Sequence, residues 1–235
     1  MTTDLHHAAP PGTRPLRGRE LTRAWVGTVT AAEFLGFVVP AVVAAVTAGA
    51  QPAVAVPAVL AAGAVEGAIL GTGQAAVLRR AIRSLDARRW TAATSVAAVV
   101  AYALGLAPST LAGTVASWPP ILLVVAGVLL GSALLASIGT AQWLVLRSHV
   151  RRAYRWIGAT ATAWLAGLGV FLAFTMPLWH PGQPVPLVVT IGVAGGLLMA
   201  ATTSVITGAA LQRLLRTAAW VSVPGSTPAP DPPTR

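Results

Sequence analysis

The sequence contains no cysteine and no lysine, and charged residues make up only 9% of it. Without cysteine, the chain has no disulfide, no thiolate metal ligand and no cysteine nucleophile. Soluble domains usually carry about 25% charged residues. Here hydrophobic residues reach 55% and the mean hydropathy is +0.73, so most of the surface is expected to face lipid rather than water.

Catalytic motifs are also lacking. His6 and His7 lie in a polar N-terminal stretch, His149 lies in a basic connection, and His180 lies beside a tryptophan outside the apolar segments. A serine or threonine nucleophile would need a base within its reach. The sequence has no metalloprotease, hydrolase-elbow or phosphate-loop motif. We therefore expect no enzyme, no catalytic residue, no metal site and no cofactor.

Six continuously apolar segments are long enough to span a bilayer as helices, for which about 20 residues suffice. They are Trp25–Ala48, Val54–Leu78, Thr91–Val115, Ile121–Leu146, Trp156–Leu178 and Leu187–Leu211. Strands of a membrane barrel would instead alternate apolar and polar residues. The sequence therefore predicts an all-α membrane protein with six transmembrane helices.

The 16 basic residues are all arginine and are distributed asymmetrically. They precede the first segment, join the second to the third and the fourth to the fifth, and follow the sixth, whereas the other three connections contain none. Positive charge is retained on the cytoplasmic side. We therefore expect both termini in the cytoplasm of a bacterium, whose GC-rich genome would explain the arginine and alanine bias, and a location in its plasma membrane.

This anchoring also accounts for the net charge of +10, so we expect no nucleic acid partner. The expected partner is the lipid bilayer. Arginine clusters at the cytoplasmic surface would attract anionic lipid headgroups, at about 1 kcal/mol per charge.

Three tryptophans, Trp25, Trp90 and Trp156, follow arginine-rich stretches at intervals of about 65 residues. Each predicted pair of segments closes with a phrase that starts with glycine and ends with Leu-Arg, at Gly71–Arg79, Gly139–Arg147 and Gly208–Arg216. Self-similarity at a fixed period indicates a repeated architecture. The sequence therefore predicts three tandem two-helix repeats.

These repeats, at about 25–89, 90–155 and 156–216, make up a predicted transmembrane domain over residues 24–220. The flanking stretches are polar and rich in proline or arginine, so neither can bury enough apolar surface to become ordered. Residues 1–23 and 221–235 are therefore predicted to be disordered cytoplasmic tails.

The phrase Gly139–Arg147, with Arg155-Trp156 after it, resembles uncharacterised bacterial multi-pass membrane proteins that carry a repeated hairpin ending in G-x-x-Q-W-x-V-L-R. Gly71–Arg79 is less similar, because Ala75 stands in place of the tryptophan. The resemblance covers most of the chain and implies the multi-pass fold. It implies no activity.

Small residues recur on the second helix of each predicted repeat. The glycines are Gly63, Gly67 and Gly71 in the first, Gly127, Gly131 and Gly139 in the second, and Gly192, Gly196 and Gly208 in the third. Residues four apart lie on nearly one helical face, and small residues let helices approach closely in lipid. We expect these glycines to pack helices, with a glycine-lined pore as the alternative.

Four polar side chains inside the apolar segments form the candidate site, namely Glu33, Glu66, Gln74 and Gln142. Gln74 lies about 20° around the helix from Gly63, which directs it inward. A buried amide needs partners, so we expect Gln74 and Gln142 to bond neighbouring backbone or each other near the cytoplasmic boundary. Leu211 takes the equivalent place in the third repeat, which argues against a ring of three glutamines.

A carboxylate deep in the membrane costs about 2.5–3.5 kcal/mol on insertion scales and is by default a functional candidate. Glu33 and Glu66 differ in estimated depth by about 8 Å, which leaves direct contact open. The positions aligned with Glu66 are Leu134 and Thr203, so no ring of acids forms. We therefore predict a structural, scaffold or lipid-interacting bundle. The alternative is a small transporter or channel that uses an intramembrane carboxylate.

Overall fold

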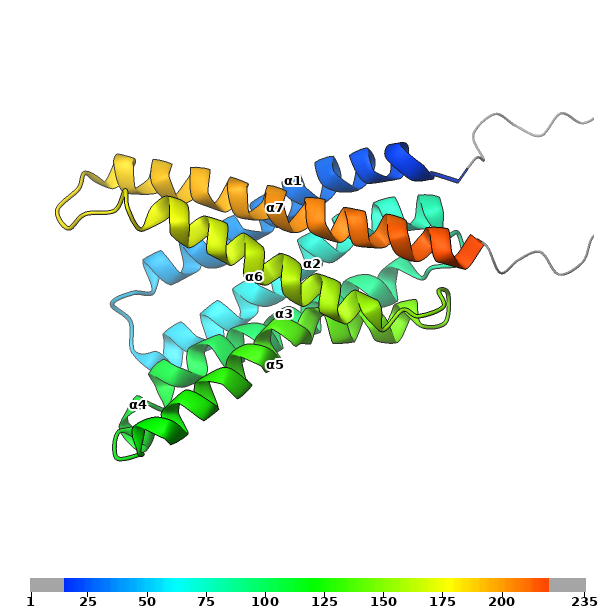
Figure 1. The fold of residues 1–235 in the computed structure, drawn as a ribbon. Coiled ribbons are helices and arrows are strands. Elements are labelled where there is room, and N and C mark those ends of the chain that lie inside the picture. Colours follow the sequence, from blue (N-terminus) through cyan, green and yellow to red (C-terminus); the bar gives the residue numbers. More distant parts are fainter. Residues whose placement is uncertain (1–14, 220–235) are drawn as a thin grey trace, which may run out of the picture.

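The structure is a computed structural model and describes residues 15–219 (Figure 1). Over this range it consists of helices joined by short turns, and it contains no strand. The helices are α1 (Gly18–Val46), α2 (Pro52–Ala81), α3 (Ala87–Thr110), α4 (Ala112–Val115), α5 (Pro120–Leu146), α6 (Arg155–Thr175) and α7 (Val185–Ala219). All except the one-turn α4 are long and apolar enough to cross a membrane. The predicted all-α membrane fold with six spanning helices is confirmed.

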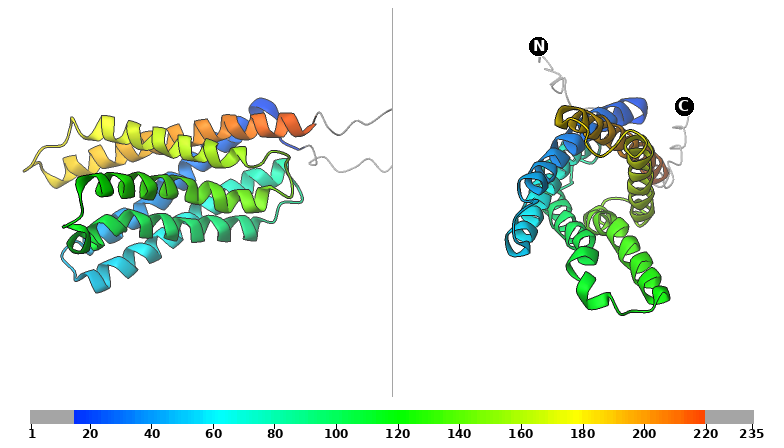
Figure 2. Two further views of the ribbon diagram at one scale, coloured as in Figure 1. Left: turned by 60° about the horizontal axis from the view of Figure 1, so that its bottom comes forward. Right: turned by 90° about the vertical axis from the view of Figure 1, so that its left-hand side faces the viewer.

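The six long helices run alternately up and down and form a closed ring. Each of them contacts the long helix before it and the one after it, and α7 returns to contact α1. The right-hand view of Figure 2 looks along the axis of this ring. The hairpins α1–α2, α3–α5 and α6–α7 follow one another around it. We call the end that holds the start of α1, the α2–α3 and α5–α6 connections and the end of α7 the arginine-rich end.

At the arginine-rich end the helices extend beyond the predicted apolar segments. α1 begins at Gly18 rather than at Trp25, and Leu21 in its first turns is buried. The predicted disordered tail over residues 1–23 is therefore wrong from Gly18 onward. Hydropathy measures only the apolar length of a helix, and arginine continues a helix readily into a polar layer. Residues 1–14 and the predicted tail 221–235 lie outside the described residues.

Polar contacts tie the connections of the arginine-rich end together. The side chain of Asp86 caps α3 by accepting the backbone N–H groups of Arg88 and Arg89 at 2.9 and 3.2 Å. The ring Nε2 of His149 lies 3.2 Å from the carbonyl oxygen of Ser84. The α5–α6 connection therefore rests against the α2–α3 connection.

The glycine stripe of α2 packs directly against α3. A Cβ atom at Gly67 would lie 2.7 Å from the Cα of Ser95, and one at Gly71 would lie 2.9 Å from the Cα of Thr91. At Gly63 a Cβ would meet the ring of Tyr102 at 2.5 Å. Only glycine permits this separation of the two backbones, so the stripe of α2 is a helix-packing surface.

The same kind of contact joins the other hairpins near the arginine-rich end. A Cβ at Gly139 on α5 would lie 2.9 Å from the Cα of Ile157 on α6, and one at Gly208 on α7 would lie 2.9 Å from the Trp25 ring on α1. Gly196 on α7 makes ordinary contact with Phe34 on α1, at 3.9 Å.

Three of the predicted packing glycines do not pack. A Cβ at Gly127, Gly131 or Gly192 would have no neighbour within 4 Å, so the expectation is wrong for these positions within this chain. For Gly127 and Gly131 the reason is that α5 diverges from α6 away from the arginine-rich end (Figure 2). Along that half of α5 the apolar side chains from Ile121 to Leu129 are exposed.

Candidate functional site

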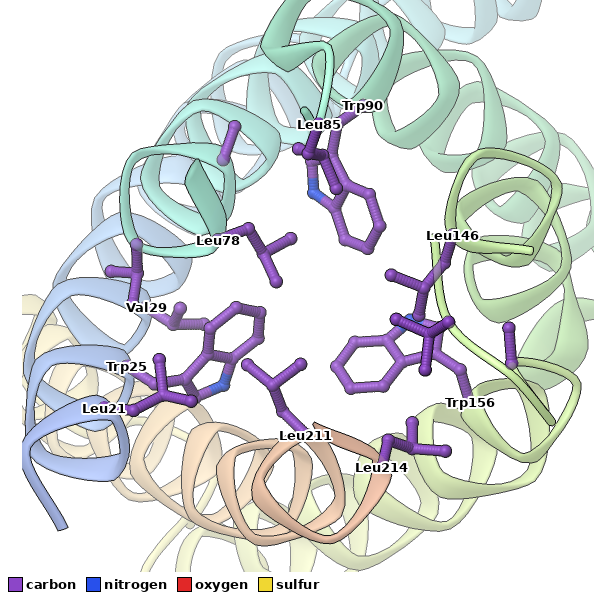
Figure 3. Close-up of a cluster of buried hydrophobic side chains, with 14 of the residues drawn as sticks. Leu21, Trp25, Val29, Leu78, Leu85, Trp90, Leu146, Trp156, Leu211 and Leu214 are labelled. Carbon is purple, nitrogen blue, oxygen red and sulfur yellow. The ribbon is translucent and has the colours of Figure 1, made fainter. Parts of the chain in front are cut away.

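Three tryptophans and three leucines meet on the axis of the ring near the arginine-rich end (Figure 3). We call them the tryptophan–leucine plug, and they are Trp25, Trp90, Trp156, Leu78, Leu146 and Leu211. Each is at most 1% exposed. The rings of Trp25 and Trp156 meet edge to face at 5.9 Å, a favoured aromatic geometry. Because almost none of their surface is accessible to water, no open channel runs between these side chains.

The tryptophan N–H groups bond to side chains of the neighbouring hairpin. Trp90 Nε1 donates to Gln74 Oε1 at 3.1 Å, and Trp156 Nε1 donates to Gln142 Oε1 at 2.8 Å. The Nε2 of Gln142 donates to Gln74 Oε1 at 2.7 Å and to Thr94 Oγ1 at 3.0 Å. The two glutamines therefore bond directly to each other, which was one of the two arrangements expected from the sequence.

The third hairpin reaches the same result with different residues. Thr207 of this hairpin is the partner of Trp25 on α1. The Oγ1 of Thr207 accepts the indole N–H at 3.0 Å and donates to the carbonyl of Thr203 at 2.8 Å. Thr207 lies four residues before Leu211, as Leu70 lies four residues before Gln74. Polar and apolar residues have thus exchanged places along α7, and the tryptophan keeps an acceptor.

The exchange leaves one hydroxyl without a partner. Thr94 and Thr160 each stand four residues after a plug tryptophan. Thr94 Oγ1 receives the amide of Gln142, whereas the buried Thr160 Oγ1 has no hydrogen-bond partner. The corresponding donor for Thr160 would come from position 211, where leucine has no amide to offer.

Glu66 lies on the inner side of α2 and is 6% exposed. Its Oε2 accepts the hydroxyl of Tyr102 at 2.6 Å, across the α2–α3 contact. A Cβ at Gly36 on α1 would lie 3.2 Å from the Cγ of Glu66, so α1 also packs closely here. Glu66 therefore faces the interior and not lipid, as predicted.

Glu33 is also buried in the interior of the bundle. It is 1% exposed, lies next to the hydroxyl of Thr203 on α7, and interacts electrostatically with Glu66. Its Oε1 has no hydrogen-bond partner. The interior of the bundle therefore holds two carboxyl groups, one of them incompletely satisfied.

A cavity of about 560 Å³ occupies the ring between the plug and the opposite end. All six long helices contribute to its wall, which is apolar apart from Glu66, Thr94 and the hydroxyl of Tyr102. Phe37 and Trp164 add aromatic surface. Thr94 also bonds to Gln142, so the cavity reaches the edge of the amide network at this residue. Such a chamber can hold an apolar molecule and offer it one carboxyl group.

Sequence reasoning identified the four polar candidates but missed most of their partners. The tryptophans were noted for their spacing, and nothing in that spacing indicated that they donate to Gln74, Gln142 and Thr207. Tyr102 is one of only two tyrosines in the chain, which was the available signal for its role beside Glu66.

No protein-family model, no curated protein and no solved structure matches the chain.

Proposed function

We propose that this protein is a lipid-interacting membrane protein that holds an apolar or amphiphilic molecule taken from the bilayer in its central cavity. The observation that carries the proposal is the cavity itself. Its volume of about 560 Å³ lies within the range of about 300–1,000 Å³ typical of ligand pockets. Its largely apolar wall suits a molecule that has already partitioned into lipid.

The divergence of α5 from α6 supplies a route of entry from the membrane. Near the arginine-rich end these helices are in contact through Gly139 and Ile157. Farther along, Leu168 of α6 lines the cavity and is 44% exposed, so the wall is incomplete beside α6. A ligand entering here would not need to leave the bilayer.

Holding a molecule fits better than moving it across the membrane, because the tryptophan–leucine plug lies between the cavity and the arginine-rich end. Its hydrogen bonds to Gln74, Gln142 and Thr207 resist opening. The alternative of a small transporter is supported by Glu66 in the cavity wall, and it requires the plug to move.

The finer assignments belong to the same proposal. The three hairpins are copies of one unit, as in the bacterial multi-pass proteins that the sequence resembles, and the membrane is the bacterial plasma membrane. The arginine-rich end faces the cytoplasm, where it binds anionic headgroups. Reporter fusions at Gln51, Trp118 and Gly182 are expected to report the outside, and fusions at Ser84 and His149 the inside. A cytoplasmic signal at Gln51 would refute this orientation.

The function is tested by blocking the cavity. Ala101 lines the cavity on α3, and Ala103, two residues on, is exposed and lies outside the lining. Ala101→Trp is expected to abolish capture of a photoreactive long-chain alcohol in lipid nanodiscs, whereas Ala103→Trp should leave it unchanged. Equal labelling of both variants and the wild type would contradict the proposal. Solute flux through reconstituted vesicles, lost in Glu66→Gln, would favour the transporter instead.

A further inference from the structure

The cavity presents one carboxyl group to whatever occupies it, and a second stands behind the first. Glu66 lines the cavity and uses only its Oε2 to accept the Tyr102 hydroxyl. Glu33 interacts electrostatically with Glu66 from outside the lining, is 1% exposed, and has an Oε1 without a partner. Two acidic groups in an apolar interior need compensation by hydrogen-bond donors or by positive charge.

The residues that the structure describes supply no positive charge at this place. The residues that line the cavity include no arginine and no histidine. Arginines in the described part of the chain lie at the arginine-rich end, around the start of α1, the α2–α3 and α5–α6 connections and the end of α7. Compensation must therefore come from protons or from a bound molecule.

The aromatic part of the cavity wall also suits a cation. Phe37, Tyr102 and Trp164 bring aromatic rings from α1, α3 and α6 into the lining. Aromatic faces attract ammonium groups, and the attraction grows when the cation is removed from water. The rest of the wall would receive an apolar body.

We propose that the cavity binds a lipophilic cation, an organic amine with an apolar body whose ammonium group lies at Glu66. This inference rests on the proposed function, since it specifies the class of molecule that the cavity holds. A neutral chain would leave compensation of the two carboxyl groups to protons alone, and a fatty acid would add a third acid to the same interior. The amine is the occupant that complements both the wall and the carboxyl groups.

The experiment compares three probes that share one photoreactive alkyl chain and end in an amine, an alcohol or a carboxylic acid. Each is offered to the full-length protein in nanodiscs of zwitterionic lipid, and cross-linked peptides are quantified by mass spectrometry. The amine is expected to label the cavity on the order of tenfold more strongly than the alcohol, and the acid to label it least. Ala101→Trp should block all three probes.

Variants assign the preference to the acidic pair. Glu66→Gln is expected to remove the preference for the amine over the alcohol. Glu33→Gln leaves the cavity wall unchanged and should reduce the preference, so the inference remains testable if Glu66→Gln does not fold. Glu20→Gln removes an exposed acid of α1 at the arginine-rich end and is the control for a lost charge.

The possible outcomes separate the two proposals. If no probe labels the cavity, the proposed function fails and this inference fails with it. If amine and alcohol label it equally, or the acid labels it best, the cavity holds molecules from the bilayer but the inference of a cationic ligand is wrong. A preference for the amine that survives both Glu66→Gln and Glu33→Gln also overturns the inference.

Discussion

The two halves of this bundle differ in how closely they pack around their buried polar groups. At the arginine-rich end, the indole N–H groups of the closely packed plug bond to Gln74, Gln142 and Thr207, and the Thr160 hydroxyl is left without a partner. In the opposite half, the same helices enclose a cavity, and Glu33 retains an oxygen without a partner. The packed half therefore maintains the ring, while the open half has the unsatisfied chemistry that a ligand could complete.

The largest loss of stability is expected from removing the side chain of Trp156, at the centre of the packed half. Trp156 contacts both other tryptophans and donates to Gln142. Trp156→Ala creates a cavity and leaves an amide oxygen without its donor, so the free energy of unfolding should fall by about 3–5 kcal/mol. Denaturant titration in micelles measures this change. Trp179→Ala, at a position 53% exposed, is the control and should have little effect.

Substituting one glycine in each half compares how closely the two halves are packed. Gly67→Leu forces a side chain against the backbone of Ser95 and should lower the free energy of unfolding by about 1–3 kcal/mol. Gly131→Leu points into open space and should be nearly silent in the same titration. Equal effects would mean that α5 is packed against another surface in the membrane.

The exchange on α7 can be reversed within the packed half. Thr207→Leu removes the acceptor of Trp25 and should cost about 1–3 kcal/mol for the unpaired indole N–H. Adding Leu211→Gln should restore stability, because an amide at that position can accept from Trp25 and donate to Thr160. The double-mutant cycle measures the coupling. A double variant that is less stable than Thr207→Leu alone would refute the equivalence of the hairpins.

The smallest change in stability is expected for a substitution at Glu66, in the open half. Glu66→Gln keeps an oxygen for the Tyr102 hydroxyl, so the free energy of unfolding should change by less than about 1 kcal/mol. Glu66→Leu removes the acceptor and should cost more. Thermal unfolding of the two variants side by side distinguishes them. A strong loss of stability in Glu66→Gln would mean that the carboxylate charge itself supports the fold.

The helices could be predicted from the sequence, but only some of the contacts between them could. Continuous apolar segments predicted all six spans, because length and hydropathy decide whether a helix can cross a bilayer. The stripes of α2 and α5 look alike in sequence, yet Gly67 packs and Gly131 does not. Packing depends on where the next helix runs, and the sequence of the stripe does not contain that information.

The candidate site shows the same limit. Repetition drew attention to Gln74 and Gln142, and their direct bond is one of the two arrangements expected from it. The partner of Glu66 could not be found in this way, because Tyr102 has no counterpart in a repeated position. Thr207 was hidden because the alignment placed Leu211 opposite the glutamines, and only the structure places the hydroxyl one helical turn earlier against Trp25.

The partners of the three tryptophans become available at very different times during synthesis. Trp90 and Trp156 bond to residues 16 and 14 positions earlier in the chain, which have already been made when each tryptophan emerges. Trp25 bonds to a residue 182 positions later. At about 5–20 residues per second, its indole waits on the order of 10 s or longer for α7. Contact between α1 and α7, which closes the ring, therefore forms last, and a chain whose synthesis stops before Thr207 remains an open row of hairpins.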